Sequence, residues 1–197
     1  MNNCIFTAHC TEAVCDKACP ALVETSYLLE RNGLSFDNEV FHETPERIAA
    51  ALDKLHKSAG KLGVVVSTES TITASNLLTY CAICENWQGN RLHCNVYHLK
   101  FSNHVEAIQR SWSTKNPPES LEYEQIWCST AKVLIISNLD YVQFKDFQAQ
   151  TLLNIIHNRM NNHLTTIVVT PPLDQLIGNQ TGFFKLLKDL LKEAEIK

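Results

Sequence analysis

Short runs of branched apolar residues alternate with longer segments of helical periodicity, and this alternation limits the fold more than any other feature of the sequence. We expect four of these runs to be strands, at residues 64–66, 94–101, 133–136 and 165–170. Helical spacing marks the segments between them, at about 75–87, 102–112 and 144–161. Strands that are joined through helices are typical of parallel sheets. The sequence therefore predicts an α/β fold with a parallel sheet flanked by helices.

Shifts in composition divide the chain into three predicted parts. Residues 1–33 form a small Cys-rich module that ends in a helix, because an Asn-Gly pair typical of helix C-termini closes it. Residues 34–62 are expected to form a linker and one helix. Residues 63–197 form the α/β domain, in which a Pro-containing loop is expected at 115–121 and an amphipathic terminal helix around 185–192.

The composition is that of a soluble globular protein, with 197 residues, 45% hydrophobic residues and a formal net charge of -4. No run of about 18 apolar residues occurs, so we expect no membrane span. The mild acidity provides no general attraction to nucleic acid. The N-terminus lacks the basic and apolar regions of a signal peptide, and a cytoplasmic location is therefore expected.

Cysteine is unusually concentrated near the N-terminus. Four of the eight cysteines lie in the first 19 residues, at Cys4, Cys10, Cys15 and Cys19. In a reducing compartment such a cluster more often binds a metal than forms disulfides. Four thiolates complete the coordination of an iron–sulfur cluster or of zinc; the Cys-Pro ending slightly favours the iron–sulfur cluster, and both stay open. The remaining cysteines are expected in the core: Cys81, Cys84, Cys94 and Cys128.

Two stretches of the α/β domain resemble a known family. Residues 133–140 (VLIISNLD) look like the Walker B strand of AAA+ ATPases. Residues 148–170 are similar to the helix and sensor-1 strand of bacterial replicative-helicase loaders of the DnaC/IstB type, including Arg159 at a position that those loaders hold as arginine. Residues 63–66 lie where that family has the strand leading into its P-loop. The resemblance covers about residues 45–195 and implies a RecA/AAA+-like sheet.

The P-loop of that family is degenerate at the matching positions. A P-loop needs glycines, whose backbone amides cradle phosphates, and a lysine that reaches the β- and γ-phosphates. The matching stretch, residues 68–75, has Thr68 and Thr73 at the glycine positions. Ala74 occupies the lysine position, and only Ser75 keeps the hydroxyl that would bind Mg²⁺.

The other catalytic elements of the family are also altered. Ser137 and Asn138 replace the Walker B acids that hold Mg²⁺ and orient water, and Asp140 lies two residues beyond them. Pro171 takes the sensor-1 polar position, and residues 181–197 contain no arginine. These changes together predict a pseudo-ATPase that does not use ATP.

The resemblance implies a non-catalytic accessory protein of DNA replication or mobile-element maintenance. Such a protein would bind a replicative helicase or an active AAA+ partner, with DNA contacted through that complex. Two alternatives stay open. One is an ATP-dependent helicase loader with an unorthodox nucleotide site, and the other is an iron–sulfur redox or metal sensor.

A few remaining residues have both functional and structural interpretations. Arg110, Trp112 and Lys115 could contact single-stranded DNA, although a solvated helix end is the favoured interpretation. Arg159 is expected to form a salt bridge on the surface of its helix. Three histidines share no ligand spacing with an acid or thiol and are expected to be surface or hydrogen-bonded residues: His93, His98 and His104.

Overall fold

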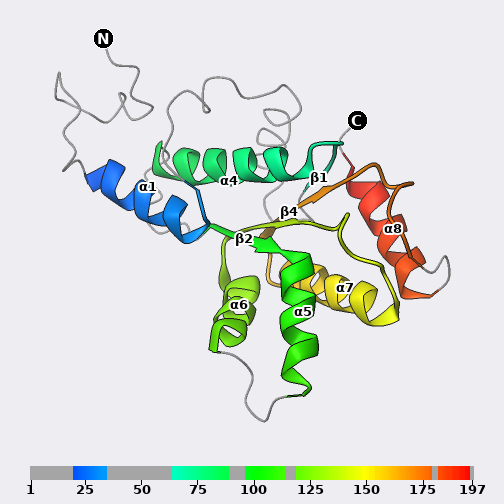
Figure 1. Cartoon of the computed structure of the whole chain (residues 1–197). Helices are drawn as coiled ribbons and strands as arrows, with labels where there is room; N and C mark the ends of the chain where they lie inside the picture. The colour runs from blue at the N-terminus through cyan, green and yellow to red at the C-terminus, as the bar shows by residue number, and fades with distance from the viewer. Residues whose placement is uncertain (1–19, 35–63, 89–95, 114–118, 179–181, 196–197) are drawn as a thin grey trace.

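Four strands form the centre of the computed structural model, which describes residues 20–34, 64–88, 96–113, 119–178 and 182–195 (Figure 1). The strands are β1 (Val64–Ser67), β2 (Val96–Lys100), β3 (Val133–Ser137) and β4 (Thr165–Thr170). The helices are α1 (Pro20–Arg31), α4 (Thr71–Gln88), α5 (Phe101–Ser111), α6 (Glu119–Thr130), α7 (Asp146–Asn161) and α8 (Phe183–Ala194).

The strands lie in the order β1-β4-β3-β2, and every neighbouring pair is parallel. From β1 the chain crosses to β2 at the far edge of the sheet and then returns through β3 to β4. Near the end of the described chain, Glu195 makes an isolated parallel bridge to Val65, on the side of β1 away from β4. The predicted α/β fold with a parallel sheet flanked by helices is therefore confirmed.

The chain crosses the sheet in one direction from β1 to β2 and in the other from β2 to β4. Because crossover connections are right-handed, the connecting helices lie on opposite faces of the sheet. α4 covers one face together with α1, which packs on it, and α5 to α8 lie on the other face (Figure 1). The core on this second face contains a row of stacked aromatic rings. Phe144 lies 6.0 Å from Phe101 and 5.4 Å from Phe184, measured between ring centroids, and all three side chains are buried.

The end of α1 covers the outer edge of β2. Asn32 Oδ1 accepts a hydrogen bond from the His98 amide at 2.8 Å, and Arg31 Nη2 donates to the Val96 carbonyl at 2.9 Å. The Arg31 guanidinium also lies 4.3 Å from the centre of the Trp127 ring. These bonds satisfy backbone groups that an edge strand would otherwise leave exposed to pairing. The helix predicted to close the Cys-rich module at 1–33 thus packs on the α/β domain.

Two boundaries differ from the prediction by three residues or more, and the others by one or two. The expected loop at 115–121 overlaps α6, whose apolar residues form no single stripe: Leu121 and Cys128 are buried, but Tyr123 and Ile126 are exposed. The periodicity that reveals a helix is therefore weak in this segment. α4 begins at Thr71, four residues before the predicted start. In the described part of the chain, no helix is long and apolar enough to cross a membrane.

Candidate functional site

The carboxyl ends of the strands meet at one edge of the sheet, and the chain reverses its direction across the sheet between β1 and β4. The helix after β1 covers one face, whereas the helices after β3 and β4 cover the other (Figure 1). In open parallel sheets, ligands bind in the crevice at such a reversal. The sequence-predicted nucleotide site lies along this edge, in residues 68–75 and at Ser137 and Asn138, so we treat the edge as the candidate site.

The turn between β1 and α4 is short. β1 ends at Ser67 and α4 begins at Thr71, which leaves residues 68–70 between them. The Thr68 amide donates to the Thr170 carbonyl at 2.9 Å, and the Ser70 amide donates to Thr68 Oγ1 at 3.2 Å. The glycine-rich part of a P-loop instead wraps free amides around a phosphate between strand and helix. Most amides of this turn already have partners in the protein.

The later positions of the predicted nucleotide site lie inside α4. Thr73 is exposed, whereas Ala74 and Ser75 are buried. Ser75 Oγ donates to the Ile72 carbonyl at 2.9 Å, and Thr79 Oγ1 repeats this pattern one turn later with the Ser75 carbonyl at 2.7 Å. The hydroxyl that matches a magnesium ligand is therefore bonded within its own helix.

Two carboxylates of the protein lie at the beginning of α4. Thr71 Oγ1 donates to Asp140 Oδ2 at 3.2 Å, and Gln175 Nε2 donates to Glu69 Oε1 at 3.2 Å. The amino end of a helix carries partial positive charge and attracts anions. Asp140 and Glu69 therefore place negative charge where a phosphate group would bind.

Ser137, at the first Walker B position, contacts a buried histidine. Its Oγ lies 2.7 Å from His98 Nε2 and donates to Asn138 Oδ1 at 3.2 Å. Burial, with a smaller contribution from Lys100, lowers the pKa of His98 to about 4, so the imidazole is neutral at pH 7. A buried serine–imidazole contact thus joins β2 to β3 at this position.

Backbone strain and unpaired polar atoms occur at the same edge. Asn138 has a φ of 61°, in the left-handed region that asparagine tolerates better than most residues. In the described part of the chain, three buried side-chain atoms have no hydrogen-bond partner, and two of them are Thr170 Oγ1 and His98 Nδ1. Pro171 follows Thr170 and supplies no side-chain donor. Such costs are typical of functional or formerly functional sites.

Arg159 lies in the interior, and the expected surface salt bridge is wrong. The side chain has no exposed surface, and burial lowers the pKa of its guanidinium to about 10. Nε donates to Thr166 Oγ1 at 2.9 Å, Nη1 to the Cys128 carbonyl at 2.9 Å and Nη2 to the Thr165 carbonyl at 2.5 Å. All three partners are neutral, so this arginine joins α7 to α6 and to the start of β4.

The predicted metal ligands Cys4, Cys10, Cys15 and Cys19 lie outside the described residues. Within the described ranges, no group of three or more His, Cys, Asp or Glu side chains is placed to hold a metal ion. Cys128 is buried as predicted, and burial together with nearby Glu124 raises the pKa of its thiol to about 12.

The other polar and aromatic candidates have structural contacts. Buried His104 lies 2.6 Å from Glu124 through its Nδ1, which joins α5 to α6. Arg110 is bonded to Glu106 on the exposed face of α5. Trp112 is exposed and contacts Phe147 edge-on, with 4.8 Å between ring centroids. This geometry agrees with a solvated helix end.

Comparison with known proteins identifies no family. No protein-family model matches the chain, and no curated protein matches it.

Two contacts at this edge were not predicted from the sequence. Glu69 accepts its hydrogen bond from Gln175, which is 106 residues away. Asp140, a poor match to a Walker B acid, is the carboxylate that reaches α4. No local spacing signals either contact, since both depend on how the strands are ordered.

Proposed function

We propose that this protein is a non-catalytic accessory factor of DNA replication or mobile-element maintenance, related to AAA+ helicase loaders, that binds a replicative helicase or an active AAA+ partner. The hydrogen bond from Thr71, the first residue of α4, to Asp140 carries the proposal. A side-chain carboxylate held there takes the place of a nucleotide phosphate. The protein would act as a pseudo-ATPase by holding, positioning or blocking its partner.

The parallel order of the strands agrees with the RecA/AAA+-like sheet that the resemblance implies. Here β1 pairs with β4, which is the sensor-1 match, and the chain returns to the other side of β1 at Glu195. The bonded amides of the β1–α4 turn and the carboxylates of Asp140 and Glu69 would both disfavour a nucleotide at this edge.

The N-terminal cysteines supply a second element of the proposal. Cys4, Cys10, Cys15 and Cys19 would hold an iron–sulfur cluster or zinc, and the resulting module would dock on the partner. Because α1 follows Cys19 directly and is bonded to β2, this module would be attached to the α/β domain at a defined position.

A titration with a fluorescent ATP analogue and Mg²⁺ tests the pseudo-ATPase, with an intact P-loop ATPase as the positive control. We expect no saturable binding up to about 1 mM. Saturable binding at micromolar concentration would contradict the proposal and would favour the ATP-dependent loader with an unorthodox site.

An anaerobic pull-down of the tagged protein, analysed by mass spectrometry, tests the partner. Recovery of a replicative helicase or an intact AAA+ protein supports the proposal. A coloured, iron-containing eluate with neither partner would contradict it and favour the metal sensor.

Metal analysis of Cys15→Ser, which is expected to lose the metal, tests the ligand assignment separately.

A further inference from the structure

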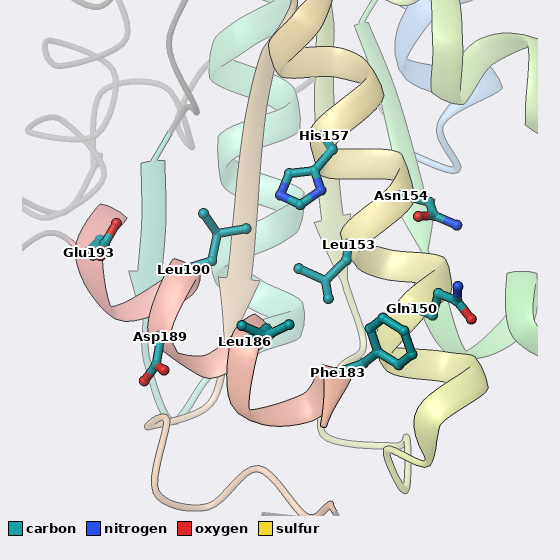
Figure 2. Close-up of a pocket in the computed structure, with 9 residues that line it drawn as sticks. All are labelled: Gln150, Leu153, Asn154, His157, Phe183, Leu186, Asp189, Leu190 and Glu193. Atoms are coloured by element: carbon teal, nitrogen blue, oxygen red, sulfur yellow. The ribbon is translucent and has the colours of Figure 1, made fainter. Parts of the chain in front are cut away.

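A groove of about 340 Å³ runs between α7 and α8 and shares no residue with the candidate site. Figure 2 shows Leu153 of α7 and Leu186 and Leu190 of α8 directed into the same space, with Phe183 at one end of α8. Leu153 is 5% exposed and lies at the base, whereas Leu186 is 59% exposed and Phe183 is 39% exposed. The groove therefore has an apolar base and an apolar margin that is open to solvent.

The spacing of these residues indicates the shape of the occupant. Phe183, Leu186, Leu190 and Glu193 recur at intervals of three and four residues along α8. Ten residues of helix span about 15 Å, so the groove is about three helical turns long. Because both walls are helices, a third helix packing along them would place its own apolar residues between these side chains.

The charge beside the groove indicates the chemistry of that helix. Asp189 and Glu193 of α8 line the groove, and none of the described lining residues is lysine or arginine. The lysines of α8 are not among the lining residues; Lys188, for example, extends over the Phe184 ring at 5.8 Å. Acidic side chains on an apolar groove complement basic residues beside an apolar stripe.

We propose that the α7–α8 groove binds an amphipathic helix of a partner protein, with leucine-type residues along one face and lysine or arginine beside them. This proposal rests on the proposed function, because it requires that the protein binds a partner. It does not depend on whether the protein binds nucleotide. It names the surface and the chemistry of the contact, which the resemblance to helicase loaders does not supply.

Two synthetic helical peptides test this proposal by fluorescence anisotropy with the full-length protein. Both are about five turns long and carry the same leucine stripe, which is flanked by lysine in one and by glutamate in the other. We expect the basic peptide to bind and the acidic peptide to bind at least about tenfold more weakly. Leu186→Asp should weaken binding of the basic peptide by about tenfold or more. The control Ile177→Asp, at an equally exposed isoleucine outside the groove, should not change it.

Reversing the charge beside the groove distinguishes specific binding from non-specific hydrophobic association. Asp189→Lys combined with Glu193→Lys should transfer the preference from the basic to the acidic peptide. Equal binding of both peptides, or no effect of Leu186→Asp, would overturn the proposal. So would self-association of the protein that Leu186→Asp abolishes, since the occupant would then be a second copy. The peptides are tested without ATP or a helicase. If they do not bind, only the groove proposal is overturned, because the pseudo-ATPase proposal is tested separately by the ATP-analogue titration.

Discussion

The two ends of the parallel strands are held by opposite chemistry. At the amino ends, Arg31 and Arg159 donate to the backbone carbonyls at the starts of β2 and β4. At the carboxyl ends, Asp140 and Glu69 accept hydrogen bonds from short neutral side chains. Arginine side chains thus donate hydrogen bonds at the amino ends of the strands, and carboxylates accept hydrogen bonds at the carboxyl ends.

The helix dipoles explain this separation of charge. Where a helix returns antiparallel to the strands, its carboxyl end lies near the amino ends of the strands and attracts cations. Arg31 and Arg159 occupy the last turns of α1 and α7. At the opposite edge, the first turn of α7 contains Asp146, and Asp140 bonds to the first residue of α4. The carboxylates of Asp140 and Glu69 thus lie at the edge where the amino end of α4 carries partial positive charge.

Removal of the buried arginine should have the largest effect on stability. We expect Arg159→Ala to lower the free energy of unfolding by about 3–5 kcal/mol, because the Cys128 and Thr165 carbonyls lose a donor and a cavity forms. Urea denaturation followed by circular dichroism measures this change. Arg110→Ala, at an exposed residue paired with Glu106, should change stability by only about 0.5 kcal/mol. Equal losses in the two variants would show that Arg159 is not the structural link described here.

Acidification should destabilise the protein through His98. Its folded pKa of about 4 lies below the ordinary value of 6.5, so the unfolded chain takes up a proton first as the pH falls. The contribution of His98 is complete above pH 6.5 and declines to its minimum near pH 4, by roughly 3 kcal/mol at most. Unfolding free energies at pH 7, 5.5 and 4.5 measure this slope. His98→Gln should flatten it, and an unchanged slope in that variant would assign the pH dependence to other groups.

The contact of α1 with the edge of β2 should contribute less to the free energy of unfolding than Arg159 or His98 does. Arg31→Ala removes one hydrogen bond to the Val96 carbonyl and the contact over Trp127, so we expect a loss of about 1–2 kcal/mol. Hydrogen exchange should become faster in α1 and along the outer edge of β2. Glu30→Ala, an exposed change in the same helix, is the control. Faster exchange confined to α4 would contradict the assignment of Arg31 to the β2 edge.

Much of the fold could be predicted because buried parallel strands are recognisable in the sequence. The runs at 133–136 and 165–170 are apolar and branched because both faces of β3 and β4 are covered by helices. α6 escaped prediction because its exposed Tyr123 and Ile126 obscure the periodicity. The spacing of apolar residues in a sequence indicates whether one or both faces of an element are buried. α6 buries too few apolar side chains to produce such a spacing.

The candidate site was less predictable, because its contacts join distant parts of the chain. The sequence predicts that Ser137 and Asn138 lie at the end of a strand, and in the structure Ser137 ends β3 and Asn138 follows it. The Thr71–Asp140 contact spans 69 residues and depends on β3 lying near β1 in the sheet. Arg159 was placed on the surface because arginine is rarely buried without an acid, and here backbone carbonyls replace the acid.

The smallest expected effect on stability concerns the two carboxylates at the start of α4. Asp140→Asn with Glu69→Gln keeps oxygen acceptors for Thr71 and Gln175 but removes the charges, so we expect a loss of about 0.5 kcal/mol that diminishes as salt is added. Asp189→Asn with Glu193→Gln changes the net charge equally at the other end of the chain and is the matched control.

The same double variant separates the two features that we propose to exclude nucleotide from this edge. We expect it still to show no saturable binding of an ATP analogue, because the Thr68 and Ser70 amides remain bonded within the short β1–α4 turn. If the double variant instead binds the analogue at micromolar concentration and the control does not, the charges alone exclude nucleotide. The turn would then be able to bind nucleotide in spite of its unusual sequence, and the two carboxylates would account for the lack of binding in the natural protein.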